Sequence, residues 1–185
     1  MGLREPTPAQ ALPELRTRRL RLVPRTLADL DDCLAMDRQP GVTEQIAGPW
    51  DDPRAHRAFI RDRIVRRYPP GQGYWTLRPK SGPDRFLGWV LLIPEDAEGP
   101  ETEIGWRLPR DAWGQGLAAE AGRALLVHGL DRLGLHRIVS DIRVGHRPSR
   151  RVAEKIGLRA TETFDQDGHR LVRYLATGPS AETGR

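Results

Sequence analysis

The residues with the clearest chemical potential are two glycines, Gly114 and Gly116, just before a long segment of helical apolar periodicity. A turn that opens a helix presents free backbone N–H groups at the positive end of the helix dipole, which favours a pyrophosphate. Glycine lets the backbone approach the phosphate oxygens closely. Taken alone, the turn does not identify its ligand. It also fits the start of an ordinary helix and the G-x-G-x-x-A pattern of dinucleotide-binding proteins.

The surrounding chain argues against a dinucleotide site. Three extended segments precede the glycines, and residues 109–112 separate the last of them from the turn. Asp141, about 25 residues further on, falls within a predicted strand, and too little chain follows for a second mononucleotide-binding half.

Periodicity, caps and turn residues predict the elements that position this turn. Strands are expected at 20–24, 74–78, 85–93, 102–108 and 136–144, with a last hairpin around Asp167-Gly168, and helices from Thr26, from Pro53, over 115–133 and over 148–156. One strand-helix-strand unit therefore lies inside an otherwise antiparallel sheet, and the fold class is α+β.

Length and composition predict one domain. The 185 residues allow one core, which we expect from about Leu15 to Thr177, between flexible tails at 1–14 and 178–185. The longest apolar run, Trp89 to Ile93, is far shorter than the roughly 20 residues of a membrane span. Charges and prolines interrupt the first twenty residues, so no signal peptide and a cytoplasmic location are expected. The single cysteine, Cys33, rules out a disulfide framework and is expected to be buried.

The net charge of +5 invites a nucleic-acid interpretation, but its distribution argues against one. Only Lys80 and Lys155 are lysines, so 30 − 2 = 28 of the basic residues are arginines, spread along the chain among Asp and Glu. This pattern indicates a compositional bias, and nucleic acid is not expected as a partner.

Three motifs in order carry a specific resemblance: Glu103 to Trp106, Trp113 to Ala121, and Ser149 with Glu154 to Leu158. Together they resemble the GNAT superfamily of N-acetyltransferases, and within it the ribosomal-protein N-terminal acetyltransferases. The similarity spans about Arg16 to Ala176. It implies a mixed, mostly antiparallel twisted sheet of six to seven strands, flanked by about four helices, with a splayed central pair of strands.

The resemblance implies acetyl-CoA as co-substrate. No metal is expected, because the histidines are scattered without ligand spacing and the chain has one cysteine. The pyrophosphate is expected on the glycine turn, and the pantetheine arm alongside the strand before it. The implied cofactor contacts are Arg107, Leu108, Trp113, Gly114, Gln115, Gly116, Leu117, Ala118, His146 and Ser149.

The resemblance also implies direct transfer of the acyl group from the thioester to an amine, so the protein needs a base and an acid. Glu103, on the splayed strand, is the expected base, although a solvated strand glutamate would look the same. The tyrosine that serves many members as acid corresponds here to Ala153. Ser149 could donate to the sulfur or cap its helix, and His146 replaces a usual asparagine and could donate to pantetheine or act as the acid.

The acceptor is expected to be a primary amine, either a protein N-terminus or a small molecule. Glu44, Trp50 and Trp106 are the predicted substrate contacts. A homodimer is an expectation from the resemblance alone. Because Ala153 and His146 depart from the familiar types, an acyl-CoA-binding regulatory domain with lost or weak turnover stays open as the alternative function.

Overall fold

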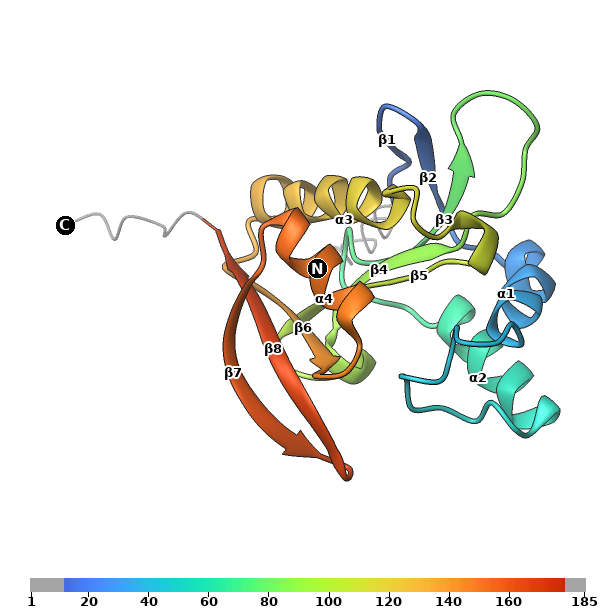
Figure 1. Ribbon diagram of the computed structural model, residues 1–185. Coiled ribbons are helices and arrows are strands. Elements are labelled where there is room, and N and C mark those ends of the chain that lie inside the picture. The colour runs from blue at the N-terminus through green and yellow to red at the C-terminus, as the bar shows by residue number, and fades with distance from the viewer. Residues whose placement is uncertain (1–11, 179–185) are drawn as a thin grey trace, which may run out of the picture.

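An eight-stranded sheet organises the computed structural model, which describes residues 12–178 (Figure 1). The strands are β1 (Leu15–Arg16), β2 (Leu20–Pro24), β3 (Gly73–Pro79), β4 (Trp89–Pro94), β5 (Thr102–Arg107), β6 (Arg137–Arg143), β7 (Arg159–Gln166) and β8 (His169–Thr177). Their order in the sheet is β1-β2-β3-β4-β5-β6-β8-β7. Every neighbouring pair is antiparallel except β5 and β6, which are parallel.

Four α-helices cover the two faces of the sheet. They are α1 (Leu30–Asp37), α2 (Pro53–Val65), α3 (Leu117–Val127) and α4 (Arg147–Ile156). The short 3-10 turns are η1 (Leu27–Asp29), η2 (Glu95–Ala97) and η3 (Arg110–Ala112), and a π-helical turn, η4 (His128–Arg132), extends α3. Figure 1 shows α3 and α4 together on one side of the sheet and α1 beside α2 on the other.

Strand alternation divides the core into two hydrophobic clusters. On β4, Val90 and Leu92 pack with α3 and α4, whereas Trp89, Leu91 and Ile93 pack with α1 and α2. Successive side chains of a strand point to opposite faces, so one buried strand serves both layers. The α+β class and its mostly antiparallel sheet are therefore confirmed.

Local signals explain several element ends. Asp52 caps α2 by accepting hydrogen bonds from the N–H groups of Arg54 and Ala55, and Pro53 stands at the first helical position. Gly157 ends α4 in the left-handed conformation, with φ of 107°. Asp167 and Gly168, both with positive φ, form the turn between β7 and β8, as expected.

Some predicted bounds were wrong. The sheet has eight strands instead of six to seven because the two-residue β1 pairs with β2, and a strand that short leaves no periodic signal. The strand expected at 85–93 begins only at Trp89, since Gly88 adopts a φ of 106°. The helix expected at 115–133 begins at Leu117 and changes to a π-helical turn at His128.

Residues 1–11 and 179–185, which hold most of the two predicted tails, lie outside the described residues. Within 12–178, no helix combines the length and the apolar character needed to cross a bilayer. Cys33 is buried, as expected, and burial raises the pKa of its thiol to about 12.

Candidate functional site

The parallel strands β5 and β6 separate soon after they meet. Their register contains two pairs, Thr102 with Ile138 and Glu103 with Val139, although β5 continues to Arg107 and β6 to Arg143. A cleft of about 920 Å³ lies at this divergence, within the range of small-molecule sites. The expected splayed central pair is therefore present, and the β5 backbone beyond Glu103 has no partner on β6.

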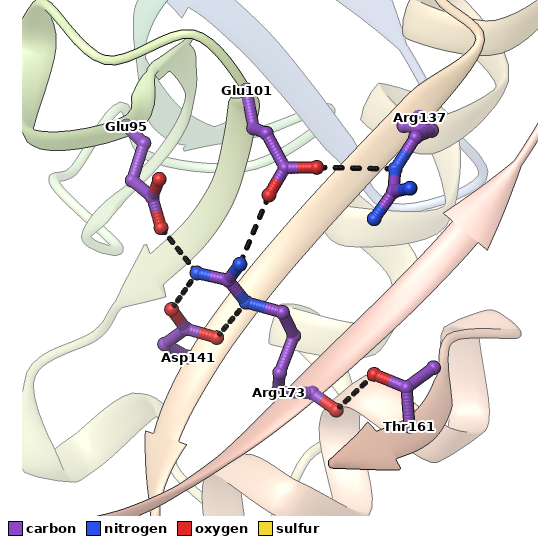
Figure 2. A network of polar contacts seen from close by, with 6 residues as sticks. All are labelled: Glu95, Glu101, Arg137, Asp141, Thr161 and Arg173. Carbon is purple, nitrogen blue, oxygen red and sulfur yellow. Dashed lines mark hydrogen bonds and ion pairs between the residues drawn. The ribbon is translucent and has the colours of Figure 1, made fainter. Parts of the chain in front are cut away.

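A polar network holds the paired end of the two strands together (Figure 2). The guanidinium of Arg173, on β8, donates two hydrogen bonds to Asp141 on β6, at 2.9 and 2.6 Å. It also donates to Glu95, which follows β4, and to Glu101, which precedes β5. Arg137 bridges to Glu101 at 3.1 Å. These bonds tie four chain segments at one point, so β5 and β6 can diverge only toward the other end.

The same network makes one end of the cleft acidic. Glu95 and Asp141 line the cleft together with Glu103, and three network carboxylates face only two arginines. Burial and the nearby carboxylates raise the pKa of Glu95. A cationic amine would be attracted to this end.

The glycine turn has the backbone conformation of an anion site. Gly114 and Gly116 both adopt left-handed conformations, with φ of 72° and 75°. Gly116 is the N-cap of α3 and offers no capping side chain, so the first N–H groups of the helix remain available. A Cβ at Gly114 would meet nothing within 4 Å, and at Gly116 only the end of the Arg19 side chain at 3.7 Å. The turn is an open cradle.

Neighbouring side chains fix this turn from outside. Glu120 accepts hydrogen bonds from Thr17 and from the backbone and side chain of Arg19, and Arg19 in turn donates to the Gln115 carbonyl at 3.0 Å. Burial would raise the pKa of Glu120, but these hydrogen bonds outweigh it and leave the pKa lowered. The side chain of Gln115 donates back to the Asp111 carbonyl. Gln115 was predicted to contact the cofactor, but it does not line the cleft and its side chain is held by Asp111. Only its backbone remains for such a contact.

Trp113 joins the turn to the strand before it and to the loop after α1. Its indole N–H donates to the Leu108 carbonyl at 2.7 Å, and its ring lies 3.3 Å from the position a Cβ would take at Gly41. The side chain is 45% exposed. Trp113 therefore supports the shape of the turn and spans toward the other half of the cleft.

The predicted cofactor contacts converge on this region. Apart from Gln115, every one of them lines the cleft. The open glycine cradle fits a pyrophosphate, and the unpaired β5 backbone fits an extended arm that carries amide groups. The residues present therefore suit an acyl-CoA molecule.

Ser149 and His146 stand at the start of α4, on the far side of the divergence. His146 is the N-cap position of that helix, and its side chain makes no capping bond. Burial, with help from Arg143, lowers the pKa of His146, so the imidazole is neutral at pH 7. Both side chains are half-buried and line the cleft.

Glu103 faces the side of the sheet covered by α1 and α2. In the register of β4 and β5, Glu103, Gly105 and Arg107 stand opposite Ile93, Leu91 and Trp89, which belong to that cluster. Directly opposed residues share a face. The expected base and the glycine turn therefore reach the cleft from different layers.

The predicted acceptor contacts do not all share that face. Trp50 donates to the Ile46 carbonyl and packs edge-on against His56 and Phe59, near α2. Trp106 stands opposite Val90, and its side chain packs with the core cluster under α3. Glu44 is exposed at the rim and accepts a hydrogen bond from the Gly41 N–H. All three line the cleft, but Trp106 does so from the α3 side.

A buried charged trio, which the sequence did not reveal, holds α1 and α2 against β5. Asp37 is fully buried, accepts a hydrogen bond from Arg107 at 2.9 Å, and bonds Nε2 of His56 at 3.0 Å. The Arg107 guanidinium also lies 4.8 Å from the centre of the Trp50 ring. Buried charges occur when they are paired, so this trio is a structural link between the helices and the cleft wall.

Arg25 is a second arginine that the sequence did not single out. It follows β2, is 7% exposed, and lines the cleft. Its guanidinium lies 3.7 Å from the centre of the Tyr74 ring and 5.6 Å from that of Trp89. Burial lowers its pKa, and no ion pair with a carboxylate holds it among the described residues.

Two other observations bear on the chemistry. Ala153, at the position of the family's usual tyrosine, is fully buried in the core cluster, so no hydroxyl reaches the cleft from there. Among the side chains that the structure describes, no group of three His, Cys, Asp or Glu residues is arranged to hold a metal ion.

Comparison with known proteins adds a family match and relatives. The family model described as an acetyltransferase (GNAT) domain matches residues 19–159. An FsC-acetyl coenzyme A-N(2)-transacetylase of Aspergillus fumigatus is 29% identical over 184 residues, which are 95% of this chain and 74% of that protein. The uncharacterised protein YkkB of Bacillus subtilis is 31% identical over 155 residues, which are 82% of this chain and 88% of YkkB.

The fold also matches solved structures. The crystal structure of a GNAT-family acetyltransferase from Bacillus anthracis superimposes with a TM-score of 0.74 over 89% of this chain and 98% of that one. The two sequences are 22% identical, so this likeness supports the architecture and not the substrate.

Proposed function

The chain belongs to the GNAT acetyltransferase family and is an acetyl-CoA-dependent N-acetyltransferase, and on that premise we propose that it acetylates a primary amine by direct attack on the thioester. The acceptor is a small-molecule amine or a protein N-terminus. Direct attack needs no covalent acyl-enzyme, because it takes place while both reactants are bound.

One observation carries this proposal. The glycine cradle at the start of α3 and the carboxylate of Glu103 open onto the same cleft, at the point where β5 leaves β6. The pyrophosphate is held by the N–H groups after Gly114 and Gly116, and the extended arm lies along the unpaired edge of β5. The thioester then reaches the level of Glu103 and Ser149.

Glu103 acts as the base, directly or through water. The acceptor arrives as an ammonium, which the acidic end of the cleft attracts, and loses one proton toward Glu103. The amine lone pair attacks the thioester carbonyl carbon, the carbon–sulfur bond breaks, and the thiolate leaves. The proton balance closes when the amide nitrogen gives up its second proton and the sulfur gains one.

Ser149 and His146 serve the leaving group. The Ser149 hydroxyl donates a hydrogen bond to the sulfur, and the neutral imidazole of His146 donates to the pantetheine arm, as an amide would. With Ala153 buried in the core, these two groups take over the part that a tyrosine plays elsewhere.

Three finer assignments complete the proposal. The Trp113-Gly114-Gln115-Gly116 sequence supports the ribosomal-protein N-terminal acetyltransferase branch. A cytoplasmic location is the second of these assignments. A homodimer rests on resemblance alone.

A second candidate function is an acyl-CoA-binding regulatory domain with weak turnover. The observation in its favour is Ala153, whose burial leaves no phenol at the usual place. Turnover of any amine at rates near those of ordinary enzymes, roughly 1 s⁻¹ or faster, would reject it.

Two measurements test the leading function. Isothermal titration should show binding of acetyl-CoA and CoA at micromolar concentrations, and thiol release should rise when an accepted amine is added. Absence of CoA binding would reject both candidate functions. Binding without thiol release, across peptides and small amines, would favour the regulatory domain.

A further inference from the structure

Unsatisfied hydrogen-bond donors gather in one part of the cleft wall. Among the described residues, six buried side-chain polar atoms have no hydrogen-bond partner, and four of them are N–H donors on Arg25, Trp89 and Arg107. These are Nε and one terminal nitrogen of Arg25, Nε1 of Trp89 and Nε of Arg107. All three residues are less than a tenth exposed and line the cleft. Buried donors normally have an acceptor, so this cluster indicates a missing one.

The three side chains form a continuous group. Trp89 and Arg107 stand opposite each other on β4 and β5, and the Arg107 guanidinium lies 4.9 Å from the centre of the Trp89 ring. The Arg25 guanidinium lies 5.6 Å from the same ring, on which both cations therefore converge. The donors belong to one site, although they come from three segments of the chain.

Charge balance distinguishes the two arginines. Arg107 is neutralised by Asp37 through a bond of 2.9 Å. Among the side chains that the structure describes, no carboxylate forms an ion pair with Arg25, and the groups that act on it electrostatically are Cys33, Tyr68, Tyr74 and Arg107. Aromatic rings offset only part of the cost of burying a cation. Of the two arginines in this cluster of donors, only Arg25 therefore carries a positive charge that no ion pair balances.

We propose that the acceptor amine carries a carboxylate, which binds Arg25 and the N–H donors of Trp89 and Arg107. This inference rests on the proposed acetyltransferase function and narrows its substrate class to amino acids and related amino carboxylates. A carboxylate brings one negative charge, which balances the single excess charge of Arg25, and its planar oxygens match the guanidinium.

Other acceptor classes fit this site less well. A polyamine or an aminoglycoside would place a second cation beside two arginines. A phosphate dianion would leave one buried negative charge without a partner. The N-terminus of a protein presents a neutral amide where the carboxylate of an amino acid would stand.

Acidic side chains of the same cleft complete the recognition. Glu95, Glu103 and Asp141 line it at the closed end of the β5–β6 divergence. An ammonium directed to this end and a carboxylate directed to Arg25 would lie along one face of the sheet, since Glu103 and Arg107 share that face. The cleft is thus complementary to a zwitterion.

The test compares matched amines. Each standard amino acid is assayed for thiol release from acetyl-CoA beside its carboxamide and its decarboxylated amine, with O-phosphoethanolamine as a phosphate probe and spermidine as a polycation. At least one amino acid should exceed its carboxamide in kcat/KM by about 10- to 100-fold, the size expected for one charge-assisted contact. Thermal shifts in the presence of CoA provide a second readout that needs no turnover.

Two variants and a control locate the effect. In Arg25→Gln the ratio of amino acid to carboxamide should fall to about one, and the thermal shift by the amino acid should vanish. Trp89→Phe keeps an aromatic ring at this position, removes the indole N–H, and should lower the ratio by only about 3-fold. The control, Arg57→Gln, removes an exposed arginine of α2 that does not line the cleft, and should leave the ratio unchanged.

The outcomes separate this inference from the function on which it rests. If CoA does not bind, the acetyltransferase proposal fails and this inference fails with it. If CoA binds but carboxamides, spermidine or O-phosphoethanolamine perform as well as the amino acids, only the carboxylate site is rejected. The same holds if Arg25→Gln folds and keeps the preference, or if no amino acid gives either thiol release or a thermal shift.

Discussion

The two halves of the cleft are built by different means. The glycine cradle in one half comes from one short stretch, 113–118, and presents mainly backbone groups. The half under α1 and α2 draws Arg25, Trp89 and Glu103 from separate strands and loops and presents side chains. Its geometry also depends on a buried ion pair, that of Asp37 with Arg107.

This difference suggests that the glycine cradle is common to many acetyltransferases, whereas the side-chain pocket is specific to this protein. A backbone cradle needs only glycines and a helix start, so many sequences can keep it while the rest of the surface changes. A side-chain pocket changes with each substitution, so it is the half that sets the acceptor. Variants in the two halves should consequently fail in different ways.

The largest effect is expected from Gly116→Glu. The glutamate must adopt a backbone φ of 75°, which is strained for a residue with a side chain, and it places a negative charge at the proposed pyrophosphate site. Affinity for CoA should fall by more than about 1,000-fold by isothermal titration. Gly82→Glu is a matched control, because Gly82 also has a positive φ, 85°, with open space around it and no place in the cleft. Equal losses in both variants would refute the cradle.

The next largest effect is on stability and belongs to the acceptor half. Asp37→Ala leaves the buried Arg107 without its carboxylate and should lower the free energy of unfolding by about 3–5 kcal/mol. Asp31→Ala breaks the exposed pair with Arg57 and should cost less than about 1 kcal/mol. Urea denaturation measures both, and similar costs would mean that the buried trio is not a structural link.

Glu103→Gln should slow turnover without weakening CoA binding. Loss of a general base costs about 100- to 1,000-fold in kcat at neutral pH. The glutamine keeps the shape, so the affinity for CoA by titration should stay within about 2-fold. Glu162→Gln, on the exposed strand β7, is the control and should leave kcat unchanged. Unchanged turnover in Glu103→Gln would reassign this residue as a solvated strand glutamate.

The smallest effect is expected at His146. Burial lowers its pKa, so at pH 7 the side chain is already neutral, and stability falls as the pH drops below about 6.5, because the ring in the unfolded chain takes up a proton before the buried ring does. His146→Ala should lower kcat about 3- to 10-fold, and His146→Asn should restore most of it if the side chain only donates a hydrogen bond. Equal losses in the two variants across a pH profile would instead identify His146 as the acid.

The fold was largely predictable because its signals are local. The Asp52-Pro53 start of α2, the glycine that ends α4 and the Asp167-Gly168 turn each act within a few residues, and the structure contains all three. The predicted element bounds were wrong where contacts between residues far apart in the sequence determine the structure. Strand β1 exists only because Leu15 and Arg16 meet β2, and the π-helical turn at His128 has no distinct sequence signal.

The site divides in the same way. The turn from Trp113 to Ala118 could be proposed from the sequence because its residues are neighbours in the chain and form a motif. Arg25 could not be singled out from the 28 arginines, because only its burial in the folded protein distinguishes it. The Asp37, His56 and Arg107 trio spans 70 residues of chain, so only the assembled structure could reveal it.

If acetyl-CoA lies along β5, as proposed, its binding also stabilises the fold. The edge of β5 that faces β6 has backbone N–H and C=O groups without a partner on β6 beyond Glu103. Bound acetyl-CoA would form hydrogen bonds with these groups, as a neighbouring strand does. By mass action, each tenfold rise of free acetyl-CoA above its Kd adds about 1.4 kcal/mol to the free energy of unfolding. The folded population would then rise and fall with the acetyl-CoA supply, and the apoprotein would be the form most exposed to proteolysis.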